Sequence, residues 1–145
     1  MENNFVKVHS NRDIFVSALI LVAGIVLIFV NNILGIVIIL CGLLFFLLHK
    51  SGYKFNNQGF VLQKKSIELS RKCQQSVLDF LNGQNKEPHL IKGNEGGTFL
   101  LEVWFNKEGK TAYAQVSVFQ DLDFRKITEI IELNSSDAQI LIEKI

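Results

Sequence analysis

Histidines, cysteines and a few acidic side chains are the residues of this chain that could do chemistry, and their spacing decides which chemistry. His9, His49 and His89 are far apart, and none has a cysteine or carboxylate at the spacing of a preformed metal site. We expect His49 to be an interfacial residue at a helix end, whereas His89 has no identifiable catalytic partner. Cys41 lies in an apolar run and Cys73 on an expected helix, which predicts two free thiols.

Two short segments come close to catalytic or ligand-binding motifs without matching them. The stretch from Gly93 to Thr98 is rich in glycine, but it lacks the lysine of a phosphate loop, and a strand rather than a helix is expected to follow. Asp121 and Asp123 lie close together at a strand end, where paired carboxylates can move a proton or hold a cation. Two acids in a turn are more often simply solvated. We therefore expect no enzyme, no cofactor and no metal.

The strongest pattern is a block of apolar residues near the N-terminus. The segments 14–30 and 33–48 carry no charge and are separated by Asn31 and Asn32. One helix over both would be about 50 Å long, against a hydrocarbon core of about 30 Å. Two helices are therefore predicted, as a transmembrane hairpin over 14–49. A buried hairpin of a soluble protein and a cleaved signal peptide are disfavoured, since the remaining chain is too short to cover the hairpin and a second span follows directly.

Small and polar residues recur every seven positions along both predicted spans, so each set lies on one helix face. Membrane helices approach closely where such residues meet. We therefore predict helix–helix packing at Ser17, Gly24, Asn31, Gly35 and Gly42. In an antiparallel hairpin that turns near Asn32, this spacing predicts that Gly24 faces Gly42 and that Asn31 faces Gly35.

Charge is small overall but unevenly distributed. A formal net charge of +1 argues against nucleic-acid binding. The segment that follows the hairpin is basic, and we expect it at the membrane surface, where anionic lipid head groups are candidate partners. These basic residues are Lys50, Lys54, Lys64, Lys65, Arg71 and Lys72. Lysine and arginine flank both outer ends of the hairpin and are missing from its turn, which predicts that both termini are cytoplasmic, in the cytoplasmic membrane of a bacterium.

Residues 50–145 are expected to form a cytoplasmic domain, preceded by the hairpin and by a cytoplasmic N-terminal segment over 1–13. Apolar and polar residues alternate over 98–106 and 111–120, which predicts an antiparallel strand pair, and a third strand is expected within 127–133. A helix is the competing interpretation of that last segment.

Three further elements complete the predicted domain. A short strand pair is expected over 53–64, and helical spacing of apolar residues predicts a helix over 66–82 that stops at Gly83. The sequence Asn134-Ser135-Ser136-Asp137 predicts the cap of a last helix. The fold class is therefore α+β: a two-helix transmembrane hairpin followed by a small, mostly antiparallel sheet domain with two helices.

A function is suggested only indirectly. We place Trp104 and Phe119 on the sheet face opposite the core, where they either cover a second layer or form a candidate partner face. Without a catalytic motif, the pattern favours a non-catalytic protein-interaction module held at the inner leaflet, with the lipid bilayer and an unknown protein as partners. Two alternatives stay open: a bacterial immunity-type protein that neutralises a toxin at the membrane, and an accessory subunit of a membrane complex.

Overall fold

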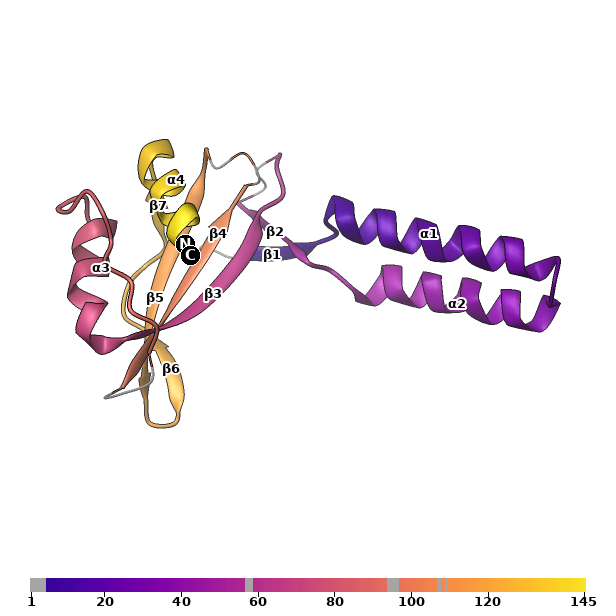
Figure 1. Cartoon of the computed structure of the whole chain (residues 1–145), viewed down its shortest axis with the longest axis horizontal. Coiled ribbons are helices and arrows are strands. Elements are labelled where there is room, and N and C mark those ends of the chain that lie inside the picture. The colour runs from indigo at the N-terminus through magenta and orange to yellow at the C-terminus, as the bar shows by residue number, and fades with distance from the viewer. Residues whose placement is uncertain (1–4, 57–58, 94–96, 107, 109) are drawn as a thin grey trace. The chain divides into compact units, whose positions relative to one another are not determined.

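The chain forms two compact units with a boundary after Val61. A computed structural model describes residues 5–56, 59–93, 97–106, 108 and 110–145. Within these residues the chain is α+β, with four α-helices and two antiparallel sheets (Figure 1). We call residues 1–61 the hairpin unit and residues 62–145 the sheet unit.

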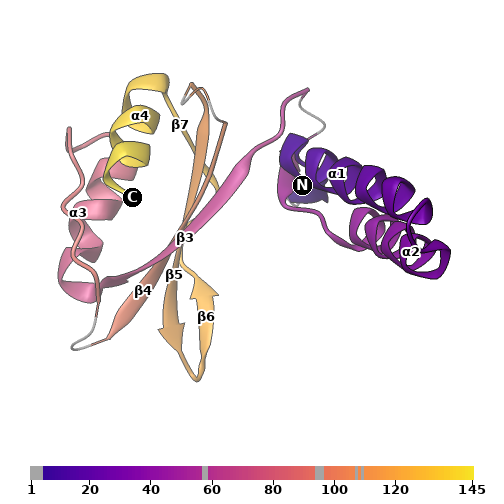
Figure 2. The same ribbon diagram turned by 45° about the vertical axis from the view of Figure 1, so that its right-hand side comes forward.

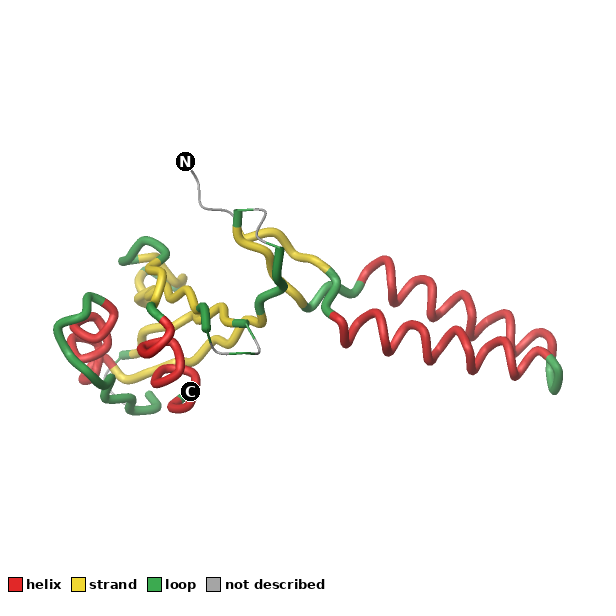
Figure 3. The backbone as a smooth tube through the Cα atoms, turned by 90° about the horizontal axis from the view of Figure 1, so that it is seen from above, coloured by secondary structure: helices red, strands yellow, loops and turns green. Residues whose placement is uncertain are grey.

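The hairpin unit consists of two antiparallel helices and a small ribbon at their open end. Helices α1 (Asn11–Ile28) and α2 (Asn32–Leu48) run side by side, as Figure 3 shows. Strand β1 (Phe5–Val8), before α1, pairs with β2 (Gly52–Phe55), after α2. Strand pairing therefore joins the two outer ends of the helix hairpin.

The helix boundaries differ from the expected 14–30 and 33–48 because side chains cap both helices. Ser10 Oγ accepts from Asp13 N at 3.2 Å, while Ser10 N donates to Asp13 Oδ2 at 2.9 Å, a capping box that starts α1 at Asn11. At the turn, Asn31 Oδ1 accepts from Leu34 N at 3.1 Å and starts α2 at Asn32. The turn therefore lies one or two residues earlier than predicted.

The sheet unit is built on an antiparallel sheet whose strand order is β3-β4-β5-β6, with β7 also paired to β5. Its strands are β3 (Gln63–Ser70), β4 (Thr98–Phe105), β5 (Ala112–Gln120), β6 (Asp123–Lys126) and β7 (Ile131–Leu133). The predicted strand pair over 98–106 and 111–120 is confirmed as β4 and β5. The predicted third strand over 127–133 is confirmed only at 131–133, where β7 pairs with the beginning of β5. Strand β6 lies before that segment and was not predicted; it pairs with the end of β5.

Helices α3 (Gln74–Leu81) and α4 (Ser135–Lys144) cover one face of this sheet (Figure 2). Alternate strand residues such as Phe99 and Leu101 point toward them and are fully buried, together with Phe80 of α3. The predicted cap of the last helix is confirmed, since Asn134 Oδ1 accepts from Asp137 N at 2.8 Å. Large apolar residues of the strands and of α3 therefore form the core of the sheet unit.

One predicted element is wrong and a second is confirmed only in its second half. The segment 53–55 does not form a hairpin with the residues that follow it, because it pairs with β1 from the N-terminus. The expected helix over 66–82 is a strand up to Ser70, a 3₁₀ turn and then α3. Pairing along the whole of β4 outweighs the helical spacing before Cys73. The predicted stop is confirmed, since Gly83 follows α3 with a φ of 73°.

Candidate functional site

Apolar side chains cover the outside of the helix hairpin. Most of the large hydrophobic residues that the structure leaves exposed lie between Ile14 and Leu48. Val22 and Leu40, for example, expose more than half of their surface, and Phe29 at the turn is 88% exposed. A soluble monomer rarely shows an apolar surface of this extent, so the hairpin exterior is the first candidate for a functional surface.

Length and composition single out α1 among the described helices as able to cross a membrane. Helix α2 is apolar throughout, but its 17 residues fall short of the length that α1 reaches. The core helix of a soluble protein and a signal sequence meet the same criterion. A core helix would be mostly buried, whereas 17% of the apolar window of α1 is buried.

Small residues occupy the contact between the two helices. Ser17, Gly24, Gly35 and Gly42 are buried there, among large neighbours that are exposed. A Cβ atom at Gly35 would lie 2.5 Å from Ile28 N, and one at Gly24 would lie 2.9 Å from Ile39 N. The helix backbones therefore approach each other where the side chains are absent.

The register of this contact differs from the predicted one. Gly24 lies against Ile39 and Gly35 rather than Gly42, a shift of about one helical turn. Asn31 lies outside the helix contact, exposed, where it caps α2. The shift follows from the earlier turn, since α2 starts at Asn32 instead of after it.

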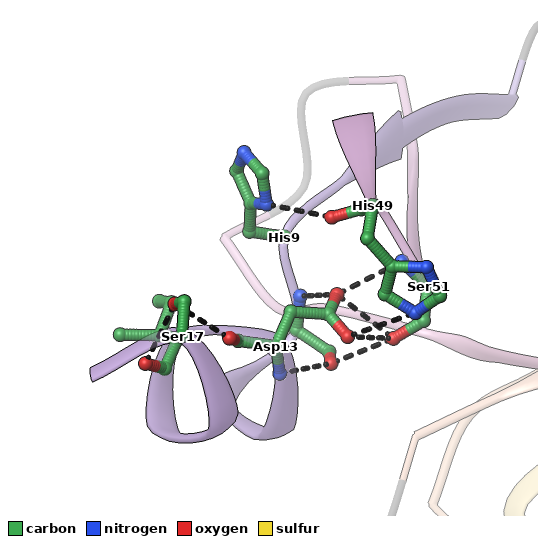
Figure 4. A network of polar contacts seen from close by, with 7 residues as sticks. His9, Asp13, Ser17, His49 and Ser51 are labelled. Carbon is green, nitrogen blue, oxygen red and sulfur yellow. Dashed lines mark hydrogen bonds and ion pairs between the residues drawn. The ribbon is translucent and has the colours of Figure 1, made fainter. Parts of the chain in front are cut away.

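A polar network closes the open end of the helix hairpin (Figure 4). We call Ser10, Asp13 and Ser51 the clasp. Asp13 is 3% exposed, and its Oδ2 accepts from Ser10 N and from Ser51 N, each at 2.9 Å. Ser51 Oγ donates to Asp13 Oδ1 at 2.7 Å and lies 2.8 Å from Ser10 Oγ. Residues from both sides of the hairpin therefore share one carboxylate.

The clasp supplies Asp13 with hydrogen-bond donors. Asp13 precedes the apolar run that begins at Ile14. Three donors, Ser10 N, Ser51 N and Ser51 Oγ, hydrogen-bond to the Asp13 carboxyl group and offset the cost of its burial. The carboxylate charge is thus balanced mainly by hydroxyl and backbone donors.

Two histidines border the clasp. His9 Nδ1 lies 3.1 Å from His49 O, and His49 Nε2 lies 3.6 Å from Asp13 Oδ1. His9 stacks on Phe46 with ring centroids 4.4 Å apart, and His49 stacks on Phe45 at 4.7 Å. These imidazoles come together although the sequence separates them widely. In the part of the chain that the structure describes, no three His, Cys, Asp or Glu side chains gather to hold a metal ion.

The six basic residues predicted at the membrane surface do not form one cluster. Lys50 and Lys54 belong to the hairpin unit, at the end of α2 and in β2. The other four belong to the sheet unit, where Lys64 and Lys65 lie at the start of β3 and Arg71 and Lys72 just past its end. A strand of this length separates its ends by about 25 Å, so these pairs lie far apart.

Individual contacts also occupy some of these cations. Lys64 forms an ion pair with Glu102 and lies over the ring of Trp104, 5.1 Å from its centroid. Arg71 Nη2 donates to Phe119 O at 3.1 Å. Lys64 and Arg71 therefore already interact with other residues of the sheet unit.

Trp104 and Phe119 both lie on the sheet face opposite the helices, since their neighbours in β4 and β5 point into the core. Trp104 is 4% exposed, whereas Phe119 is 43% exposed and packs edge-on against Phe124. Of the two, Phe119 alone presents a surface to solvent. The partner face itself stays a prediction.

The acidic turn that the sequence singled out is the tip of the β5–β6 hairpin. Asp121 Oδ2 pairs with Arg125 Nη2 at 2.8 Å, and Asp123 Oδ1 accepts from Phe124 N at 2.7 Å. Leu122, between the two acids, is 91% exposed and has a φ of 68°. Both carboxylates are thus engaged locally. Residues 94–96 of the glycine-rich segment lie outside the described residues.

Sequence reasoning did not identify the clasp. The capping box of Ser10 and Asp13 has a sequence signal, a serine followed three residues later by an acid before an apolar run. The contact with Ser51, 38 residues beyond Asp13, has no local signal. Comparison with known proteins adds no candidate, since no family model, no curated protein and no solved structure matches this chain.

Proposed function

We propose that this chain is an integral membrane protein whose helix hairpin spans a bilayer and holds the sheet unit at one membrane face. The observation that carries the proposal is the exposed apolar surface of α1 and α2, combined with a polar closure at one end. Hydrocarbon covers such a surface favourably, while the capped, charged end remains in water.

The closure at the open end also bears on the alternatives. Removing α1 as a signal sequence would take away β1 and Asp13, which hold β2 and Ser51. A core helix of a soluble protein would need cover that the described residues do not supply. Both considerations favour an uncleaved hairpin in lipid.

Helix length is compatible with two short spans. At 1.5 Å per residue, α1 and α2 extend about 26 Å, slightly less than a hydrocarbon core of about 30 Å. A mismatch of this size is accommodated by modest thinning of the bilayer. Since β1 pairs with β2, the two ends of the hairpin must lie on the same side.

Charge supports one orientation. Lys7 and Arg12 precede the apolar run, Lys50 and Lys54 follow it, and the turn carries no basic residue. The positive-inside tendency then places both ends of the hairpin, and the sheet unit, in the cytoplasm.

For the sheet unit we propose a non-catalytic role in binding a protein partner. Support comes from apolar side chains around the β5–β6 hairpin that remain exposed, Phe119, Leu122 and Ile127. Leu122 also has a positive φ, which costs a non-glycine residue about 1–2 kcal/mol. Asp121 also has a positive φ, of 51°, and both values fit the two-residue turn between β5 and β6. The exposure of Leu122 is therefore the observation that favours a functional tip.

Membrane insertion is tested by expressing the full chain and washing its membranes with alkaline carbonate. We expect the chain in the pellet at its full-length mass. The double variant Val22→Arg/Leu40→Arg should pellet less, since each arginine at the bilayer centre costs about 2.5–3.5 kcal/mol. The matched control Gln75→Arg, at an exposed position of α3, should pellet like wild type. A wild-type chain that is washed off, or shortened from its N-terminus, refutes the tether.

Partner binding is tested by crosslinking in intact membranes, comparing wild type with Phe119→Ala/Leu122→Gln. Trp104→Ala is unsuitable, because that side chain is buried. We expect crosslinked proteins that disappear in the variant and persist in Gln84→Ala, an exposed position outside this hairpin. An identical set of crosslinks in wild type and variant would count against a partner at the β5–β6 hairpin.

A further inference from the structure

We propose that the base of the hairpin unit binds the head groups of acidic phospholipids through four side chains, here called the base cations. They are Lys7, Arg12, Lys50 and Lys54. This inference rests on the proposed function, since only a spanning hairpin places its base among lipid head groups. It adds a partner of defined chemistry, a lipid phosphate with net negative charge.

The fold brings the base cations together from both ends of the helix hairpin. Lys7 lies opposite Tyr53 in the β1–β2 ribbon, and Lys54 lies opposite Val6. Successive strand residues point to opposite faces, so the two lysines project from opposite faces of the ribbon. Arg12 lies in the first turn of α1, and Lys50 directly follows the residue that caps α2. The four cations therefore flank the apolar helices where these meet the ribbon.

Among the described residues of the hairpin unit, Asp13 is the one acid, and it does not pair with the base cations. It is 3% exposed, and Ser10 and Ser51 supply the close donors to its carboxylate. Because the clasp engages this carboxylate internally and the described hairpin residues hold four Lys or Arg against one acid, the base keeps an excess of positive charge at its surface.

Four cations of the sheet unit form ion pairs, whereas the base cations form none among the described residues. Lys64, Lys110, Arg125 and Lys144 each pair with a glutamate or aspartate. Lys7, Arg12 and Lys50 are exposed and Lys54 is half-buried, and no ion pair is recorded for them within the described part of the chain. Other lysines of the sheet unit also form no ion pair among the described residues, namely Lys65, Lys72, Lys86, Lys92 and Lys126. The base differs in its surroundings, because Asp13 is the one acid between positions 5 and 61, whereas acidic residues are spread along the whole sheet unit.

Acidic lipid fits this surface better than a soluble anion does. The base cations border a continuous apolar surface, so a ligand that matches both parts must carry a negative head group beside hydrocarbon chains. A cation near an anionic membrane surface strengthens attachment about five-fold. Four of them predict a shell of acidic lipid that is enriched several-fold over the bulk bilayer.

The test uses the full chain in bilayers of phosphatidylcholine with a minor share of phosphatidylglycerol. Polymer-bounded discs are cut out around the protein, and the ratio of the two lipids is compared with that of empty discs. Lys7→Gln/Lys54→Gln removes two base cations while Arg12 and Lys50 keep the charge that orients the hairpin. Lys86→Gln/Lys126→Gln makes the same charge change at exposed positions of the sheet unit. Circular dichroism checks that each variant is folded.

We expect phosphatidylglycerol to be enriched at least two-fold around wild type and around the sheet-unit control, and clearly less around Lys7→Gln/Lys54→Gln. Added inorganic phosphate at constant ionic strength should not displace the lipid, because it lacks the apolar part. Three results would overturn the inference and leave the membrane tether intact. They are a phosphatidylglycerol content equal to that of empty discs, an equal loss of enrichment in both double variants, and displacement of the lipid by phosphate. If the chain does not enter bilayers at all, that result contradicts the proposed function instead.

Discussion

The two units of this chain differ in the kinds of residue that they bury. In the helices of the hairpin unit the buried residues are small or polar, such as Gly24, Gly35 and Asp13, and most exposed residues are large and apolar. In the sheet unit the buried residues are large and apolar, such as Phe80 and Phe99, and charged side chains lie outside. The kinds of residue that are buried are therefore opposite in the two helices of the hairpin and in the sheet unit.

Different driving forces explain the contrast. Removal of apolar surface from water stabilises the sheet unit, at about 25 cal/mol per Å². Helices in lipid gain nothing from that effect, so close backbone contact at small residues and satisfied polar groups hold them together. The comparison supports the proposal that the two units face different solvents.

The largest expected effect is in the sheet-unit core. Phe99→Ala removes a fully buried ring and should destabilise the unit by about 3–5 kcal/mol. Urea unfolding followed by the fluorescence of the single tryptophan, Trp104, measures it. The matched change Phe119→Ala, at a ring that is 43% exposed, should cost about 1 kcal/mol. Equal costs would contradict the assigned core.

The clasp should come next. Asp13→Ala leaves the donors of Ser10 and Ser51 without their acceptor, at a cost of about 2–3 kcal/mol. Val6 and Lys54 are register partners, so cysteines at both positions should crosslink readily in the native background and poorly beside Asp13→Ala. Asn11→Ala, an exposed neighbour, is the control. Unchanged crosslinking would mean that the ribbon closes the hairpin without the clasp.

Helix packing should respond to a single added methyl group. In Gly35→Ala the new Cβ would meet the Ile28 backbone at under 3 Å, so the helices must separate, at about 1–3 kcal/mol. Spin labels at Leu19 and Leu44, both exposed, should report a longer and broader distance distribution. Ile36→Ala, on the exposed side of α2, should leave the distribution unchanged, and similar distributions in both variants would argue against the glycine contact.

The smallest effect is expected at the β5–β6 tip. Leu122 has a positive φ and almost no contacts to lose, so Leu122→Gly should stabilise the sheet unit by up to about 1 kcal/mol. Thermal unfolding of the full chain detects the shift. A loss of stability instead would show that the leucine side chain packs against the unit.

Local patterns predicted much of the fold. Alternation identified β4 and β5, capping chemistry identified α4, and the uncharged block identified the helix hairpin. Long-range pairing accounts for the failures, since β2 takes its partner from the N-terminus and β3 is a strand because β4 lies beside it. The local sequence of β2 or of β3 does not indicate which strand it pairs with.

The candidate site was predictable only in part. Seven-residue spacing singled out the glycines that the hairpin buries, but the helix register depended on where Asn31 placed the turn. Asp13 has a local capping signal, whereas its contact with Ser51 depends on the closed hairpin. The spacing of small residues thus identifies which helix faces are in contact, and the residues that cap the helices determine the register of that contact.

The central claim is that the hairpin crosses a bilayer with both ends on one side. Single cysteines at Val6, in β1, and Val30, at the turn, test it directly in a Cys41→Ala background, since Cys73 is buried. Sealed membrane vesicles of either orientation are treated with an impermeant maleimide. We expect Val6→Cys to react only from the cytoplasmic face and Val30→Cys only from the opposite face. Reaction of both cysteines from the same face would contradict a spanning hairpin.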